Sequence, residues 1–168
     1  KGEWVHFTKA VFDNDKKIVW RQTADTINAA LMNFQAYFGK TIHAGLIKDK
    51  YKNKVDIYYA LAIFNSKYID YIYRHKVAET GKVFPQVKLK YLRDLPFVVG
   101  DKEQQKELSS LAKRMIKLNK QLQSIPENSD KWNSVKKEIE KVDGEIDERV
   151  YKLYDLTLKE REAVDKIK

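Results

Sequence analysis

Apolar residues change their spacing along the chain, and this change divides the sequence into two parts. From residue 4 to residue 47 they alternate with polar residues or form short β-branched and aromatic groups, in WVHF, KIVWRQ, TINAALM and AYFGKTIHAGLI. The pattern predicts several short β-strands, separated by turn residues in DNDKK and at Gly39. KDKYKNK, residues 48–54, is predicted to be a polar, basic loop.

One amphipathic helix is predicted next, in VDIYYALAIFNSKYIDYIYRHKVA, with Gly81 after its end. Its apolar stripe advances by steps of four and three residues, through Ile57, Leu61, Phe64, Tyr68 and Ile72. The helix is rich in aromatic side chains that could in principle stack on bases. At helical spacing we expect them to belong to the core instead: Tyr58, Tyr59, Phe64, Tyr68, Tyr71 and Tyr73.

A further strand is predicted in the stretch GKVFPQVKLKYLRDLPF. Four apolar residues alternate there with polar or basic ones, which is typical of a half-buried strand whose outer edge is positively charged. The apolar positions are Val83, Val87, Leu89 and Tyr91, and the polar ones are Gln86, Lys88 and Lys90. We expect this strand to end at DLPF, before the spacing of apolar residues changes.

From residue 101 the apolar residues recur at steps of three and four, which predicts two long helices. The break between them is IPENSD, where a proline precedes an Asn or Ser suited to capping the next helix. The second helix, about residues 128–155, would be roughly 40 Å long. Its apolar pattern is interrupted near Arg149, which indicates a shift of face or a new partner surface. Thr157 with Glu160 predicts a capped last helix.

These patterns predict an α+β fold in which residues 1–100 form a mixed α/β module with several short strands and one amphipathic helix. Residues 101–168 would form a long, coiled-coil-like helical hairpin that acts as a spacer or docking arm. The same apolar seam would be buried if the hairpin closed on itself or paired with a second copy in a homodimer. The sequence leaves both arrangements open.

Composition agrees with a folded domain, because 43% of the 168 residues are hydrophobic. No apolar run approaches the roughly 20 residues that span a bilayer, and the first residues form no signal peptide, so we expect a cytoplasmic protein without membrane contact. The chain does not begin with methionine, which suggests a fragment of a longer protein. The absence of cysteine excludes disulfides, thiolate catalysis and cysteine-ligated zinc.

The net charge of +9 is unevenly distributed. Residues 1–100 hold 17 Lys and Arg against 9 Asp and Glu, a net of +8, whereas residues 101–168 hold 16 against 15, a net of +1. A basic half indicates a polyanion or an anionic membrane as partner, although a basic surface that only aids solubility is the simpler alternative. The balanced half is typical of a solvated structural element.

Residues that could carry out catalysis do not form a recognisable set. His6, His43 and His75 lie far apart in sequence, and none has a second metal ligand at a suitable spacing. The glycines form no phosphate-binding loop, and the carboxylates of the basic half are scattered. We therefore expect no catalytic residues, metal site or bound cofactor in this chain.

Side chains suited to DNA are concentrated in three segments of the basic half. Arg, Lys and Gln pair with guanine and adenine edges in the major groove, and Lys and Thr suit phosphates. For each of these residues a solvated strand edge is the alternative. The predicted DNA-binding residues are Arg21, Gln22, Thr23, Lys40, Thr41, Lys82, Gln86, Lys88 and Lys90.

Four segments of the chain closely resemble a known family. They are ALAIFNSKYIDYIYR, GKVFPQVKLKYLRDLPF, MIKLNKQLQS and EIEKVDGEIDERVYKLYDLTLKE. The family is the C-terminal specificity domain of TaqI-like adenine DNA methyltransferases and of combined restriction-methylation enzymes, and the chain is also similar to half of a type I restriction specificity subunit. The resemblance covers about residues 18–165. Its most distinctive pieces are IFNSK, GKVFPQVK, LRDLP and ERVYKLYDLT.

The resemblance implies a target recognition domain that reads a short sequence in double-stranded DNA and is not catalytic by itself. Its partner would be the methyltransferase domain or subunit of a restriction-modification enzyme, with or without a fused endonuclease, as in type II enzymes. S-adenosylmethionine and the catalytic Asn-Pro-Pro-Tyr loop would belong to that other domain. Lys82 and Lys88 would contact phosphates. Loops near Arg21, Gln22, Lys40 and Gln86 would read base edges.

Two other functions are compatible with the sequence. The first is a protein–protein interaction module with a coiled-coil dimerisation arm and only non-specific affinity for DNA. The second is an enzyme whose catalytic residues the patterns above do not show.

Overall fold

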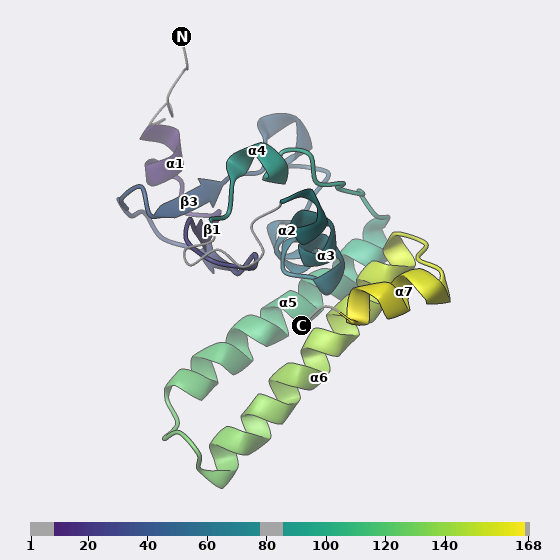
Figure 1. Ribbon diagram of the computed structural model, residues 1–168. Coiled ribbons are helices and arrows are strands. Elements are labelled where there is room, and N and C mark those ends of the chain that lie inside the picture. Colours follow the sequence, from purple (N-terminus) through teal and green to yellow (C-terminus); the bar gives the residue numbers. More distant parts are fainter. Residues whose placement is uncertain (1–8, 78–85, 167–168) are drawn as a thin grey trace.

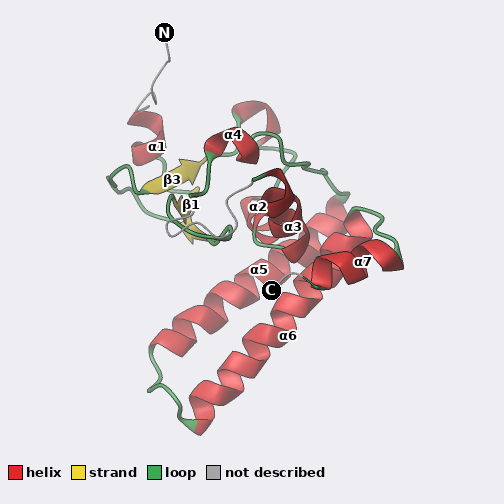
Figure 2. Cartoon of the chain, in the orientation of Figure 1, coloured by secondary structure: helices red, strands yellow, loops and turns green. Residues whose placement is uncertain are grey.

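The computed structural model describes residues 9–77 and 86–166 of the chain. A three-stranded antiparallel sheet lies at one end, next to several short helices, and a long helical hairpin extends away from them (Figure 1). Helices make up most of the molecule (Figure 2). The elements are α1 (Lys9–Asp13), β1 (Lys17–Arg21), β2 (Ala29–Met32), β3 (Ile42–Gly45), the 3-10 helix η1 (Asp49–Tyr51), α2 (Ile57–Phe64), α3 (Lys67–Lys76), α4 (Leu89–Leu92), α5 (Lys102–Gln123), α6 (Asp130–Leu153) and α7 (Leu158–Asp165).

This architecture confirms the predicted α+β fold. The strands lie in the order β2-β1-β3, with Lys17 opposite Met32 on one side of β1 and Arg21 opposite Ile42 on the other. All three strands fall in segments where alternation predicts them. The fourth such segment, WVHF, lies outside the described residues, and α1, which follows it, was not predicted.

The central strand β1 has buried side chains on both faces. Trp20 packs edge-on against Phe64 of α2, with ring centroids 5.2 Å apart. Lys17 is completely buried, and its ammonium donates hydrogen bonds to the backbone oxygens of Phe12 at 3.0 Å and Asn14 at 2.5 Å. A buried lysine requires such partners. It therefore fastens the turn between α1 and β1 to the sheet.

The prediction of a single amphipathic helix after the loop was wrong, because the chain forms two helices, α2 and α3. At the break, the side chain of Asn65 pairs with the backbone of Ala29 in β2, through hydrogen bonds of 2.8 and 2.9 Å. Ser66 donates to the oxygen of Ile63 and accepts from the nitrogen of Ile69, so it caps α3. Side chains of Asn and Ser can replace the backbone bonds of a continuing helix, and here they do so.

The prediction of a strand in GKVFPQVKLKY was also wrong for the residues of this stretch that the structure describes. Gln86 forms an isolated bridge with Thr23, and the chain then turns into α4. The hydroxyl of Tyr73 donates to the oxygen of Gln86 at 3.1 Å and accepts from the nitrogen of Lys88 at 2.9 Å, which holds this corner against α3. Val83 and Gly81 lie outside the described residues.

The predicted helical hairpin is confirmed by α5 and α6, which pack along each other (Figure 1). Asp101 and Gln104 form a capping box at the start of α5, and Ser129 caps α6 in the predicted break. Thr157 and Glu160 form the predicted capping box of α7. The hairpin therefore begins and ends where its sequence signals indicate.

One hydrophobic cluster joins the sheet to the base of the hairpin. It contains Trp20 from β1, Tyr59 from α2, Leu108 from α5 and Val142 from α6. The hydroxyl of Tyr59 also accepts a hydrogen bond from the nitrogen of Gly100 at 2.9 Å, at the start of the hairpin. The first turns of α5 are thus built into the same core as the sheet.

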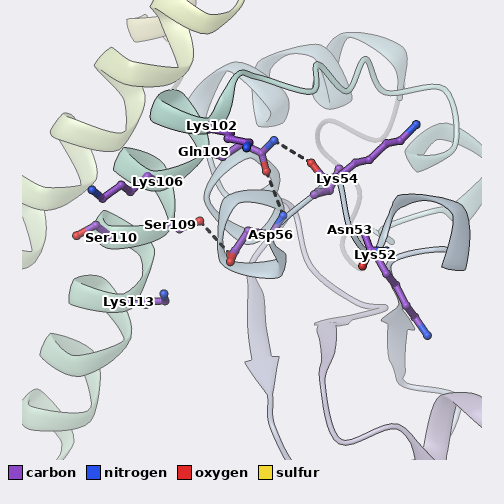
Figure 3. A pocket seen from close by; sticks show the side chains of 11 residues that line it. Lys52, Asn53, Lys54, Asp56, Lys102, Gln105, Lys106, Ser109, Ser110 and Lys113 are labelled. Atoms are coloured by element: carbon purple, nitrogen blue, oxygen red, sulfur yellow. Dashed lines mark hydrogen bonds between the residues drawn. The ribbon is translucent and has the colours of Figure 1, made fainter.

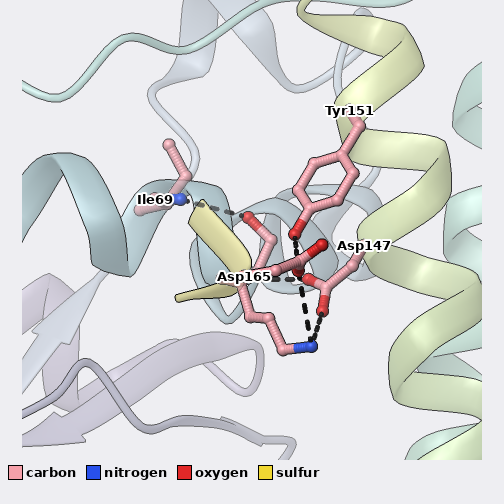
Figure 4. A network of polar contacts seen from close by, with 6 residues as sticks. Ile69, Asp147, Tyr151 and Asp165 are labelled. Atoms are coloured by element: carbon pink, nitrogen blue, oxygen red, sulfur yellow. Dashed lines mark hydrogen bonds and ion pairs between the residues drawn. The ribbon is translucent and has the colours of Figure 1, made fainter. Parts of the chain in front are cut away.

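The face shift predicted near Arg149 corresponds to a polar network between α3, α6 and α7 (Figure 4). Asp147 is buried and accepts a hydrogen bond of 2.9 Å from the backbone nitrogen of Lys67, whose ammonium lies 3.3 Å from the same carboxylate. Tyr151 donates to Asp165 at 2.8 Å. These contacts dock α7 and the start of α3 against α6.

Candidate nucleic-acid interface

Three segments that are distant in sequence meet at one end of the sheet. β1 ends at Arg21, which lies opposite Ile42, the first residue of β3. One residue further, the nitrogen of Gln22 donates to the oxygen of Thr41 at 2.8 Å. The oxygen of Gln22 accepts from the nitrogen of Val87 at 2.7 Å. The backbone of Gln22 is therefore held between the start of β3 and the segment that follows residue 85.

The same arrangement directs polar side chains away from the core. Thr23 pairs with Gln86 in an antiparallel bridge, and Val87 beside it is almost completely buried. Because successive side chains of an extended segment point to opposite sides, Gln86 and Lys88 face solvent. Gln22 is half-buried, and the exposed predicted residues around it are Arg21, Thr23, Lys40, Thr41, Gln86 and Lys88.

The structure brings together five of the nine predicted residues by direct pairing or adjacency along a strand: Arg21, Gln22, Thr23, Thr41 and Gln86. Lys40 directly precedes Thr41 in the chain, and Lys88 lies two residues after Gln86. Lys90 is not on a strand edge as predicted, but on α4, with its ammonium 5.7 Å from the centre of the Tyr91 ring. Lys82 lies outside the described residues.

Sequence reasoning missed two exposed aromatic residues that follow β2, which ends opposite Lys17 at the other end of β1 from Arg21. Phe34 and Tyr37 lie on the connection between β2 and β3 and are 58% and 78% exposed. The ring of Tyr37 stacks on Phe12, with centroids 5.1 Å apart, so one face of an exposed ring is supported from the protein side. Aromatic rings of this kind stack on bases. The sequence signal that could have identified these two residues is the aromatic group NFQAYFGK. Part of this group was assigned to a strand because of its alternating apolar residues.

The aromatic helix residues mostly serve the core, as predicted. Tyr59 and Tyr73 are buried, and Tyr68 packs against Tyr154 with ring centroids 4.8 Å apart. His43 lies on β3 against Trp20, with ring centroids 5.9 Å apart, and burial lowers its pKa. A neutral imidazole packed on the indole is a structural contact.

Neither a metal centre nor a membrane span is found in the parts of the chain that the structure describes. No three of its His, Asp and Glu side chains gather closely enough to hold a metal ion. None of its helices combines the length and hydrophobicity that crossing a bilayer requires.

Comparison with known families identifies the first part of the chain. Residues 3–97 match the TaqI-like C-terminal specificity domain. This match covers more than half of the chain, so the chain belongs to that family. Specificity domains of this family recognise DNA sequences in restriction-modification enzymes. A search among curated proteins found no match to the chain.

Proposed function

We propose that the chain is the target recognition domain of a site-specific adenine DNA methyltransferase from a restriction-modification system. The observation that carries this proposal is the meeting of Arg21, Thr41 and Gln86 at one end of the sheet, in a domain that belongs to a specificity family. Side chains there provide guanidinium, hydroxyl and amide groups within one small surface. These are the groups that distinguish base pairs in the major groove.

The roles of the residues follow from how they are held. The backbone groups of Gln22 are occupied by the hydrogen bonds to Thr41 and Val87, which fix the position of this residue between the two segments. Arg21 would bind the O6 and N7 acceptors of a guanine, and Gln22 or Gln86 would bind an adenine through its N6 and N7. Lys40 and Lys88 flank these groups and would contact phosphates, which adds affinity without sequence preference.

Methyl transfer would belong to another domain of the parent enzyme, which would also bind S-adenosylmethionine. In this proposal the hairpin sets the position of the recognition surface relative to that domain. The first turns of α5 share the hydrophobic core of the sheet, which makes the hairpin a rigid connection and not a flexible linker. The base that is methylated would be flipped out of a duplex that the recognition domain holds in register.

The proposal is tested by selecting bound duplexes from a random DNA pool at about physiological salt and sequencing them. We expect a short enriched motif that contains an adenine. A pool that stays unenriched, while the chain still binds DNA with the salt dependence of a generic basic protein, would contradict the proposal. That outcome would favour a protein–protein interaction module.

A further inference from the structure

A basic cleft lies between the loop that follows η1 and one face of α5 (Figure 3), and its lining includes none of the side chains assigned to base reading. Its volume is about 640 Å³. One carboxylate, that of Asp56, contributes to its lining. Five lysines line it: Lys52, Lys54, Lys102, Lys106 and Lys113.

The lysines come from two regular patterns in the sequence. On α5, Lys102, Lys106, Ser109 and Lys113 follow each other at steps of four, three and four residues, so they share one face of the helix. Leu108 of the same helix is buried in the core. On the other side, KDKYKNK places a lysine at every second position. The basic face of α5 therefore lies opposite a basic loop.

Hydrogen bonds fix the two walls of the cleft against each other. Gln105 donates to the oxygen of Lys54 and accepts from the nitrogen of Asp56, at 2.9 and 3.1 Å. Ser109 donates to the carboxylate of Asp56 at 2.9 Å, and that carboxylate also caps α2 through the nitrogen of Tyr58 (Figure 3). The one carboxylate of the lining is thus already engaged in holding α2 and α5 together.

Much of the positive charge of the cleft is not neutralised. Lys52 pairs with Asp49 at 2.7 Å, and the ammonium of Lys113 lies over the ring of Tyr58 at 4.6 Å. The other three lysines of the lining are Lys54, Lys102 and Lys106. In the described part of the chain, no carboxylate lies within ion-pair distance of their ammonium groups.

We propose that this cleft binds the phosphate backbone of the DNA duplex, outside the base pairs that are read. The identity of the partner rests on the proposed function. Lysine ammonium groups are compact charges that suit phosphates and give no base discrimination. From Lys102 to Lys113 the helix rises about 16 Å, and successive phosphates of one strand rise about 3.4 Å along the duplex axis. The lysine face is thus long enough to follow several phosphates.

The consequence is a second role for the hairpin. Its first turns would hold the duplex as well as support the recognition module, so the DNA footprint would extend beyond the end of the sheet. The charge count of residues 101–168, a net of +1, conceals this surface, because the lysines of α5 gather on one face.

The test compares two double variants that each remove two positive charges. Lys102→Gln with Lys106→Gln alters the cleft, and Lys131→Gln with Lys141→Gln alters exposed positions of α6 outside its lining. Affinity of the whole chain is measured at several salt concentrations, on a duplex selected from the random pool and on a scrambled duplex. Circular dichroism checks that both variants are folded.

The cleft variant is expected to lose on the order of tenfold in affinity on both duplexes, and its slope of log K against log salt should fall by about two. The control variant should keep the slope of the unaltered chain. Equal slopes in the two variants would overturn the inference even if a motif is selected. Binding of an acidic peptide that requires the cleft lysines, with DNA affinity unchanged, would also overturn it and indicate an acidic protein partner. A pool that yields no motif, combined with a cleft-dependent slope, would contradict the proposed function alone.

Discussion

Arg21 is the residue with the clearest individual prediction. It ends β1, is exposed and lies beside the segments that carry Thr41 and Gln86. Arg21→Ala should weaken binding to the selected motif by about 1–3 kcal/mol and relax the preference at one base pair. Affinities for the motif and for its single-base variants would show this. Lys16→Ala, at the exposed residue just before the other end of β1, is the control and should leave base preference unchanged.

An equal loss on every duplex in Arg21→Ala would contradict base reading by this residue. It would instead identify Arg21 as a phosphate contact, and the slope of affinity against salt would fall by about one.

Asp147 makes a prediction about pH. Burial raises the pKa of this carboxyl above its ordinary value of 3.8, although the hydrogen bond and charge of Lys67 oppose the shift. The folded state therefore binds a proton more tightly than the unfolded state, so ionisation of Asp147 lowers the free energy of unfolding as pH rises from about 4. Asp143 has a pKa raised for the same reason, so it contributes with the same sign.

Asp147→Asn should remove the contribution of Asp147 to this pH dependence, because an amide does not ionise. The amide oxygen can still accept the hydrogen bond from the backbone nitrogen of Lys67. Urea denaturation at several pH values from 4 to 7 measures the effect. The free energy of unfolding should decline less with rising pH in the variant than in the unaltered chain. Identical pH dependence in both proteins would contradict the assignment.

At the scale of elements, the break between α2 and α3 has a decisive test. Ser66 caps α3 and is buried, so Ser66→Ala should lower the free energy of unfolding by about 1 kcal/mol or more. In one continuous helix the same change would be neutral or stabilising, because Ala is the better helix former. Urea denaturation distinguishes the two signs. Ser134→Ala, at an exposed position of α6, is the control and should cause no loss.

The elements also show what the sequence can predict. The hairpin was predictable because its apolar steps of three and four continue over many residues and its caps are local. The break at Asn65 was not, since it depends on a pairing with Ala29, 36 residues earlier. The strand predicted near Lys88 failed because Leu89 and Leu92, three residues apart, bury equally well from a helical turn.

The candidate site was predictable in its parts but not in its arrangement. Arg21, Thr41 and Gln86 were each chosen for side-chain chemistry near strand ends. Their meeting depends on the bridge between Thr23 and Gln86, which lie far apart in sequence and have no local signal for pairing. The cleft on α5 was missed for a related reason, because its lysines come from both halves of the chain.

At the scale of the whole molecule, the shared core predicts that the sheet and the hairpin unfold together. Val142 is completely buried in the cluster that also holds Trp20. Val142→Ala should lower the free energy of unfolding by about 2 kcal/mol. It should shift the transition followed by tryptophan fluorescence and the one followed by circular dichroism to the same extent. Two separated transitions would show that the base of the hairpin is energetically independent of the sheet.

The central claim is that this chain reads DNA sequence, and the ratio of two dissociation constants tests it most directly. Affinity is measured at about physiological salt on the selected duplex and on a scrambled duplex of equal length and composition. The account predicts that the selected duplex binds more tightly by a factor of about 10³, the low end for specific recognition. A ratio near one would mean that the chain binds only the charge of DNA, and it would contradict the account.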